Sequence, residues 1–234
     1  MALTAVALAA ALFLLTRAGY IRPNRPDEAR YPVRGVDVSA WQGQIDWQQL
    51  QEQGVDFAFI KATEGAAAQD RCYRDHVQEA MRNGVRVGSY HFFSFDSDGF
   101  QQAENFIRTA QYVRGMLPPV VDVELYGAYR DQPPDGESLR RELDVLLGRL
   151  EAVYGVRPII YTSMRMYYRY FMGMYEDYPL WISAIYCPPL LPFGARCVFW
   201  QYTDRGELRG YDGQQYIDLD VFCGTEEEFA AFGW

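Results

Sequence analysis

The chain has 234 residues, 49% of them hydrophobic, which is enough to bury one large core. Lys and Arg number 22 against 31 Asp and Glu, and the formal net charge of −9 opposes the phosphate neutralisation on which nucleic-acid binding depends. Nucleic acid is therefore excluded as a main partner, and one domain is expected, because barrels of alternating strands and helices often reach this length.

The first predicted element is a targeting segment. Residues 1–16 are uncharged and mostly apolar, and the run is shorter than the roughly 20 residues of a membrane-spanning helix. It has neither a basic start nor a clear cleavage site, so signal peptide and signal anchor remain alternatives. Residues 17–32 are polar and contain proline, as in a linker, and the folded domain is expected over 33–234. We expect such a protein outside the cell or at its surface, with a membrane tether if the segment is retained.

From residue 34 onward, β-rich apolar runs alternate with amphipathic helical stretches. The expected strands are Gly35–Val38, Phe57–Ala62, Arg86–Phe92, Pro119–Val123, Pro158–Thr162, Leu180–Ser183, Val198–Tyr202 and Ile217–Val221. The expected helices are Asp46–Gln53, Arg71–Asn83, Gly99–Arg114, Glu137–Tyr154 and Ser163–Met172. Helices become few after the fifth strand. This order predicts a single-domain α/β fold, a TIM-like (β/α)5(β)3 barrel with five strand–helix units and three trailing strands.

Acidic residues gather where the predicted strands end. Asp37 ends the first strand, Glu64 follows the second, Asp122 and Glu124 end the fourth, and Asp218 lies in the eighth. In a parallel barrel the carboxyl ends of the strands share one rim. The five acids are therefore expected to converge there and to form a site.

Asp122 and Glu124 are the most informative pair. Alternate residues of a strand face the same side, so both carboxyl groups point together. Their mutual repulsion, with burial, raises the pKa of one and makes it a candidate general acid at neutral pH. Glycoside hydrolysis needs such an acid and a second carboxylate. The apolar run before them favours a buried strand over a solvated loop.

Four cysteines, Cys72, Cys187, Cys197 and Cys223, have neither metal-ligand spacing nor histidine partners, so no metal site is expected. Export would allow disulfides. Four cysteines have three connectivities, and Cys187 and Cys197 flank a proline-rich loop that a bridge between them would staple. Four reduced buried thiols are the alternative.

Several segments together resemble glycoside hydrolase family 25, the muramidase-type lysozymes. They are Arg34–Gly43, Phe59–Gly65, Gly88–Phe93, Pro119–Glu124, Pro179–Ile182, Trp200–Thr203 and Ile217–Asp220. The resemblance implies a (β/α)5(β)3 barrel, in agreement with the strand count. It also implies hydrolysis of the β-1,4 bond between N-acetylmuramic acid and N-acetylglucosamine in bacterial peptidoglycan, with the glycan strands as partner and with no metal or organic cofactor. We expect a monomer.

The resemblance also implies roles for individual residues. Glu124 matches the general acid and Asp122 its neighbouring carboxylate, while Asp37 and Asp218 match the other two acids of the site. Asp218 is favoured over Asp220, two residues away on the same face. Residues expected to contact the sugars are Trp41, Glu64, Tyr90, Tyr161, Trp181, Trp200 and Tyr202.

Some alternatives remain open at this point. Glu64 is equally a loop acid that pairs with Lys61, and His91, inside a buried strand, is interpreted as structural and not as a catalytic base. Asp122 either orients the N-acetyl group of the substrate or acts on water or the sugar directly. The other function classes are a hydrolase of another N-acetylated glycan such as chitin, and a glycan-binding barrel without catalysis.

Overall fold

The computed structural model describes residues 4, 6–8, 11, 15, 24–192 and 194–233. The predicted targeting segment and the first part of the predicted linker lie mainly outside the described residues. Within the described part of the chain, no helix combines the length and the apolar character needed to span a membrane.

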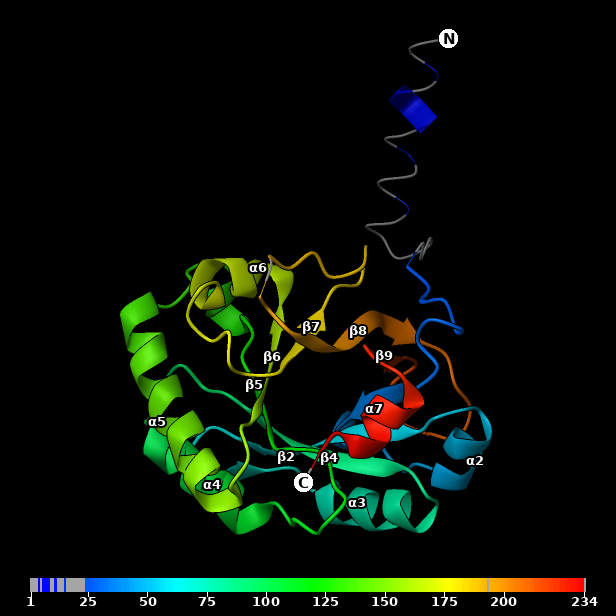
Figure 1. Cartoon of the computed structure of the whole chain (residues 1–234), viewed down its shortest axis with the longest axis horizontal. Coiled ribbons are helices and arrows are strands. Elements are labelled where there is room, and N and C mark those ends of the chain that lie inside the picture. Colours follow the sequence, from blue (N-terminus) through cyan, green and yellow to red (C-terminus); the bar gives the residue numbers. More distant parts are fainter. Residues whose placement is uncertain are drawn as a thin grey trace.

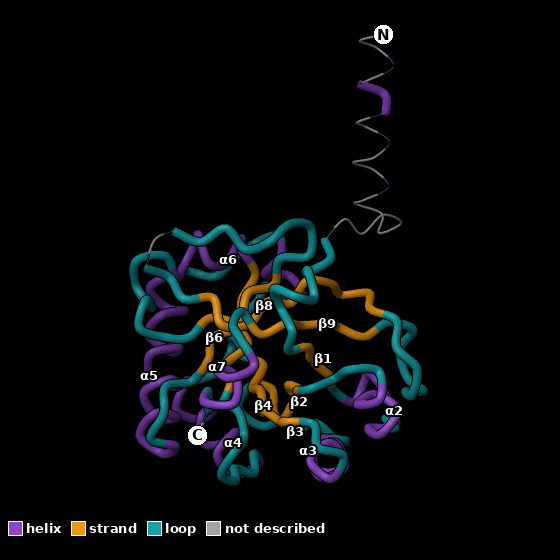
Figure 2. The backbone as a smooth tube through the Cα atoms, turned by 45° about the vertical axis from the view of Figure 1, so that its right-hand side comes forward, coloured by secondary structure: helices purple, strands orange, loops and turns teal. Residues whose placement is uncertain are grey.

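Eight strands close into a barrel, with helices around it (Figures 1 and 2). The strands are β1 (Arg34–Val38), β2 (Phe57–Glu64), β4 (Arg86–Phe92), β5 (Val120–Asp122), β6 (Ile159–Ser163), β7 (Leu180–Ser183), β8 (Cys197–Gly206) and β9 (Ile217–Phe222). Neighbours pair in the order β1-β2-β4-β5-β6-β7-β8-β9, and β9 returns to β1. A short strand, β3 (Ala68–Gln69), forms a hairpin with β2. The predicted (β/α)5(β)3 barrel is confirmed.

The last barrel strand runs in the opposite direction to the other seven. β1, β2, β4, β5, β6, β7 and β8 pair in parallel, whereas β9 is antiparallel to both of its neighbours, β8 and β1. The start of β9, not its end, therefore lies at the rim where the parallel strands finish. Asp218, its second residue, stays at that rim, directly opposite Asp37 of β1.

The five predicted helical regions are present, and their bounds differ from the predicted ones by a few residues. They are α2 (Trp47–Glu52), α3 (Tyr73–Arg82), α4 (Gly99–Thr109), α5 (Gly136–Tyr154) and α6 (Met164–Met166), which continues into the π-helical turn η3 (Tyr167–Phe171). Single 3₁₀ turns follow β1 and β5, at η1 (Ala40–Gln42) and η2 (Gly127–Arg130). α4 ends five residues earlier than predicted. The chain leaves the helix there, and the Gln111 backbone N–H donates to the Tyr73 hydroxyl at 3.0 Å in place of a helical carbonyl.

The acidic tail forms a further helix, α7 (Glu226–Ala231), which the sequence did not indicate. Thr225 caps it in a capping box with Glu228, and acidic side chains suit the positive end of the helix dipole. The side chains of Glu226, Glu227 and Glu228 are exposed. Phe229 packs on Phe57 and Phe222 and covers the end of the barrel opposite the acidic rim.

Aromatic side chains fill the barrel interior. Phe59 stacks on Trp181 with ring centroids 4.4 Å apart, and Phe199 packs edge-on against Phe59. Gly88 makes room for this layer, since a Cβ atom there would lie 2.6 Å from the Phe59 ring. A second apolar core lies between the sheet and the helices. The solid interior leaves one open end, where the polar residues gather.

Candidate active site

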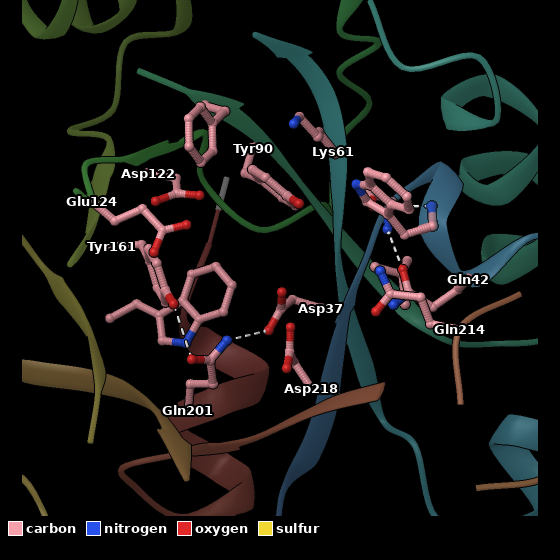
Figure 3. Close-up of a pocket in the computed structure, with 15 residues that line it drawn as sticks. Asp37, Gln42, Lys61, Tyr90, Asp122, Glu124, Tyr161, Gln201, Gln214 and Asp218 are labelled. Carbon is pink, nitrogen blue, oxygen red and sulfur yellow. Dashed lines mark hydrogen bonds between the residues drawn. The ribbon is translucent and has the colours of Figure 1, made fainter. Parts of the chain in front are cut away.

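The four predicted catalytic acids line one pocket of about 200 Å³ at the carboxyl ends of the parallel strands (Figure 3). Asp122 and Glu124 form one wall, and Asp37 and Asp218 lie on the opposite side. These residues are far apart in the sequence, and the closed barrel brings them together, as the sequence predicted.

Backbone hydrogen bonds hold Asp122 and Glu124 on the same side. The Asp122 carbonyl accepts from Phe93 N–H at 2.9 Å, and Val123 N–H donates to the Tyr161 carbonyl at 2.9 Å, so the chain stays extended past the end of β5. Val123 is buried in the outer core. Asp122 and Glu124, on either side of Val123, therefore point into the pocket, where their carboxyl groups lie side by side (Figure 3).

Burial changes the acidity of this pair. Asp122 is only 6% exposed, and one of its carboxyl oxygens, Oδ1, has no hydrogen-bond partner among the described residues. Burial first, and then the charge of Glu124, raise the pKa of Asp122 well above its usual range. Burial also raises the pKa of Glu124, while the charges of Arg130 and Lys61 oppose that rise. The pair can therefore retain a proton at a pH where exposed carboxyls have lost theirs.

Gln201 organises the opposite wall. Its amide Nε2 donates to Asp37 Oδ2 at 2.8 Å, and its Oε1 accepts from the Tyr161 hydroxyl at 2.9 Å. Burial raises the pKa values of Asp37 and Asp218 well above the usual range; the Asp220 charge adds to the rise for Asp37, and the Asp37 charge to that for Asp218. Hydrogen bonds from Tyr161 on β6 through Gln201 on β8 to Asp37 on β1 thus fix the position of the Asp37 carboxyl group.

Asp220 lies below the pocket and is fully buried. Its Oδ1 accepts from the Trp181 indole N–H at 2.8 Å. Burial raises its pKa well above the usual range, and the bond from Trp181 opposes that rise. Asp218, by contrast, lines the pocket. Of the two acids between which the sequence was ambiguous, Asp218 is the one placed to meet a ligand.

Four of the predicted aromatic residues surround the pocket. Tyr90, Tyr161 and Trp181 line its inner part, and Trp41 lies at its edge with 70% of its surface exposed. Burial and the nearby carboxylates raise the pKa values of Tyr90 and Tyr161 well above their usual range. Both hydroxyls are therefore neutral hydrogen-bond donors across the ordinary pH range.

Trp200 and Tyr202 lie elsewhere, and their prediction as sugar-contacting residues is corrected. β8 turns Phe199 and Gln201 inward, so Trp200 and Tyr202 face the outer core, where both are buried. Trp200 donates its indole N–H to the Ala184 carbonyl at 3.0 Å and packs edge-on against Tyr31. Neither side chain lines the pocket.

Glu64 lies beside the pocket and does not line it. It forms an ion pair with Lys61 at 2.7 Å, the alternative that the sequence left open. Both residues border a second hollow of about 330 Å³, which also includes Trp41 and Arg71. Lys61 and Trp41 are common to the two hollows, so they adjoin.

Sequence reasoning missed the amide groups of the pocket. Gln42, Gln201 and Gln214 line it, together with Ser39, Lys61 and Phe92. Gln201 carried a signal, because it is the one polar residue between two aromatics in Trp200–Tyr202 and so marks the other face of the strand. Gln42 and Gln214 lie in loops with no comparable pattern.

His91 is structural, as interpreted from the sequence. It is fully buried, with Nδ1 at 2.7 Å from Thr63 Oγ1 and Nε2 at 3.0 Å from Gln102 Oε1. Burial lowers the pKa of His91 to about 4, so the ring is neutral at neutral pH. Within the described ranges, no cluster of His, Cys, Asp and Glu side chains has an arrangement that could hold a metal ion.

Comparisons with known proteins identify the family of the chain. The family model for glycosyl hydrolases family 25 matches residues 36–211. The uncharacterized protein YegX of Escherichia coli (strain K12) is 36% identical over 209 residues, which cover 87% of this chain and 74% of YegX. A family 25 glycosyl hydrolase from Bacillus anthracis has a TM-score of 0.85 at 44% identity, covering 92% of this chain and 99% of that one. The bacterial lysozyme from Streptomyces coelicolor has a TM-score of 0.77 at 28% identity, covering 86% and 96%. The chain therefore belongs to glycosyl hydrolases family 25.

Proposed function

We propose that the protein is a lysozyme of the muramidase type, which hydrolyses the β-1,4 bond between N-acetylmuramic acid and N-acetylglucosamine in peptidoglycan, with Glu124 as the general acid. The observation that carries the proposal is the buried carboxylate pair Asp122 and Glu124 on one wall of an open polar pocket. Membership of family 25 supports it, as does the similarity to the Streptomyces coelicolor lysozyme.

Glu124 is suited to protonate the leaving oxygen. Its carboxyl group lines the pocket while being mostly shielded from water, and the raised pKa keeps a proton available to the pair at neutral pH. Transfer of that proton to the glycosidic oxygen breaks the bond between this oxygen and the anomeric carbon. The ionised Glu124 can then take a proton from the water that completes hydrolysis.

Asp122 is suited to hold the N-acetyl group of the substrate. It lies next to Glu124 on the same extended segment and on the same wall of the pocket (Figure 3), so it would not face Glu124 across a bound sugar ring. An ionised Asp122 accepts a hydrogen bond from the acetamido N–H and makes the acetamido oxygen more nucleophilic. This oxygen attacks the anomeric carbon as the leaving oxygen departs, and water then opens the ring that forms, so the configuration is retained.

The opposite acids are assigned to substrate binding. Asp37 Oδ2 already accepts a hydrogen bond from the Gln201 amide at 2.8 Å, and Asp218 lies directly opposite Asp37 in the strand register. Their carboxyl oxygens can accept hydrogen bonds from sugar hydroxyls.

The two adjoining hollows suit a linear polymer. A sugar at the carboxylate pair would place its neighbour in the hollow bordered by Glu64 and Arg71, with the exposed Trp41 ring between the two. Flat amphipathic rings pack well against the apolar faces of sugars. Peptidoglycan strands are the proposed partner, and action on the cell wall implies a site of action outside the cell or at its surface.

The test is a digest of purified peptidoglycan with the full chain, followed by reduction of the new ends and mass spectrometry. A muramidase leaves muramic acid at the reducing end, which reduction converts to muramitol. Glucosamine at that end would refute the proposal, and so would the absence of any cleavage. Chitin is digested in parallel, because faster cleavage of chitin identifies a hydrolase of another N-acetylated glycan. The Glu124→Gln protein, purified in the same way, controls for contaminating lysozyme.

A further inference from the structure

Two of the four cysteines are neighbours in the fold, although 26 positions separate them in the sequence. The Sγ atoms of Cys197 and Cys223 are 3.9 Å apart. Cys197 begins β8, and Cys223 directly follows β9. Both are free thiols in this structure. They lie near the closed end of the barrel, away from the acidic pocket, so the catalytic site does not explain their proximity.

Backbone pairing brings the two thiols together. β8 and β9 are antiparallel, with Phe199 opposite Phe222, and Cys223 N–H donates to the Val198 carbonyl at 2.8 Å. β8 also holds one extra residue relative to β7, because Leu180 pairs with Cys197 but Trp181 pairs with Phe199. The irregularity at Val198 brings Cys197 to the side on which Cys223 lies. The separation is thus set by strand register and not by a loop.

The geometry favours this pairing over the others. Disulfide sulfurs are about 2.05 Å apart, and the Cβ atoms of bridged cysteines are about 3.5–4.5 Å apart. The Sγ atoms of Cys197 and Cys223, at 3.9 Å, are already within about 2 Å of that bonding distance. Cys72, which precedes α3, and the exposed Cys187 make no contact with another cysteine in the part of the chain that the structure describes. The bridge between Cys187 and Cys197 that the sequence allowed therefore has no support here.

The pair is also accessible to a reagent. Both thiols line an open hollow of about 640 Å³, bordered by Tyr31 and by residues of the segment that precedes β1. Thiol–disulfide exchange proceeds by attack of a thiolate on an accessible disulfide sulfur, so the oxidant needs such an approach. The hollow admits a small disulfide to a pair that is otherwise half-buried.

We propose that Cys197 and Cys223 form a disulfide when the protein is in an oxidising compartment. A disulfide-bonded oxidant, such as glutathione disulfide or an oxidised dithiol oxidoreductase, supplies the oxidising equivalents. One cysteine thiolate attacks the oxidant and expels a thiolate, giving a mixed disulfide. The second cysteine thiolate attacks the protein sulfur of that bond, which expels the other thiolate. The two cysteines lose two protons and two electrons in total, and the oxidant becomes two thiols.

The bond would connect the two strands that carry one wall of the pocket. β8 supplies Gln201, and β9 supplies Asp218. β9 is also the antiparallel strand that closes the barrel against β1. A covalent link at the base of β8 and β9 constrains the unfolded chain and opposes separation of the last strand, and we expect it to raise Tm by roughly 5–15 °C.

The experiment uses the full chain in a glutathione redox buffer under native conditions. Free thiols are then blocked with an alkylating reagent, and the peptides are mapped by mass spectrometry. We expect a cross-linked peptide that contains Cys197 and Cys223, with Cys72 and Cys187 alkylated. Alkylation of both Cys197 and Cys223 in oxidising buffer would overturn the proposal, as would a bridge from either of them to Cys187.

Melting curves in oxidising and reducing buffer provide the second measurement. We expect Tm to be higher in oxidising buffer for the wild type and for the matched control Cys187→Ser, and to be equal in the two buffers for Cys223→Ser. An oxidation-dependent rise that persists in Cys223→Ser would overturn the assignment of the pair, and an unchanged wild-type Tm would overturn the stabilising role. If Cys223→Ser does not fold, the wild-type peptide map decides the pairing alone.

Discussion

Gln201 donates a hydrogen bond to Asp37, from Nε2 to Oδ2 at 2.8 Å, and so connects the seventh barrel strand, β8, to the first, β1, past the intervening β9. The same amide accepts the Tyr161 hydroxyl at 2.9 Å. Its orientation is therefore fixed from two sides. This amide holds the Asp37 carboxyl in one position before any substrate arrives.

Replacement of Gln201 by leucine should lower kcat with little change in fold. The substitution removes the donor to Asp37 and leaves the Tyr161 hydroxyl without its acceptor, and the loss of a buried hydrogen bond to a carboxyl is worth about 1.5–3 kcal/mol, which corresponds to roughly 10–150-fold. Because the bond from Gln201 lowers the pKa of Asp37, that pKa should rise further in the variant. Steady-state kinetics on a soluble glycan fragment test this, with Tyr161→Phe as the comparison that removes only one of the two bonds. Wild-type kcat in Gln201→Leu would contradict the proposed role.

Glu124→Gln should remove nearly all turnover and leave the protein folded. The amide has the shape of the acid but no proton to donate, and general acid catalysis contributes about 10²–10⁴-fold. Turbidity loss of a cell-wall suspension gives the rate, and circular dichroism gives the fold. Glu79→Gln on the outer face of α3 is the matched control, because Glu79 forms a surface ion pair with Arg82, far from the pocket residues. If Glu124→Gln kept more than about a tenth of the wild-type rate, another group would be the acid.

The dependence of rate on pH should be bell-shaped, and Arg130 should influence its basic limb. Activity falls on the basic side as the acid loses its proton, and on the acidic side as the neighbouring carboxylate gains one. The positive charge of Arg130 lowers the pKa of Glu124. Arg130→Ala removes this charge, so the basic limb should move to higher pH. Profiles of kcat/KM at low ionic strength, where the charge is least screened, measure the shift. A basic limb that moves to lower pH would exclude Glu124 as the group that sets it.

The carboxylate pair could be predicted because strand periodicity is local. Val120 to Asp122 form a buried strand, and the alternation of side chains alone places Asp122 and Glu124 together. The barrel and its eight strands followed in the same way from apolar runs and helix signals. The reversed direction of β9 could not be predicted, because the alternation of side chains in a strand of six residues is the same whichever way the strand runs.

The misassigned aromatics show where periodicity fails. Phe199, Trp200 and Tyr202 are all buried, and a strand that is apolar on both faces does not reveal which residues point inward. α7 was missed for a related reason. It has six residues, too few to be stable from propensity alone, and it depends on the packing of Phe229 against Phe222.

Trp41 and Trp200 should respond in opposite ways to truncation. Trp41 is 70% exposed at the edge of the pocket, so Trp41→Ala should raise KM by roughly 2–10-fold through loss of ring packing on the sugar, with Tm almost unchanged. Trp200 is 1% exposed in the outer core, so Trp200→Ala should cost about 3–5 kcal/mol of unfolding free energy. Denaturant unfolding and KM are measured for both variants. A large loss of stability in Trp41→Ala, or none in Trp200→Ala, would contradict these placements.

The anomeric configuration of the first product separates the two roles proposed for Asp122. Asp122 lies beside Glu124, so it is poorly placed to attack the far face of the anomeric carbon and well placed to polarise the N-acetyl group (Figure 3). We therefore expect a β-configured product from the β-linked substrate. Asp122→Asn should reduce kcat more than it raises KM, since the carboxylate acts mainly on the charge that develops during bond breaking.

Proton NMR, recorded before the product mutarotates, shows the configuration directly. The readout does not depend on the stability of any variant, because it uses the wild-type enzyme. An α-configured first product would require water to attack from the opposite side, where Asp37 and Asp218 lie, and would transfer the base role to one of them. The Asp37 carboxyl is already held by the Gln201 amide at 2.8 Å, which argues against its use as that base. The retained configuration is thus the expected one, with the substrate itself as nucleophile.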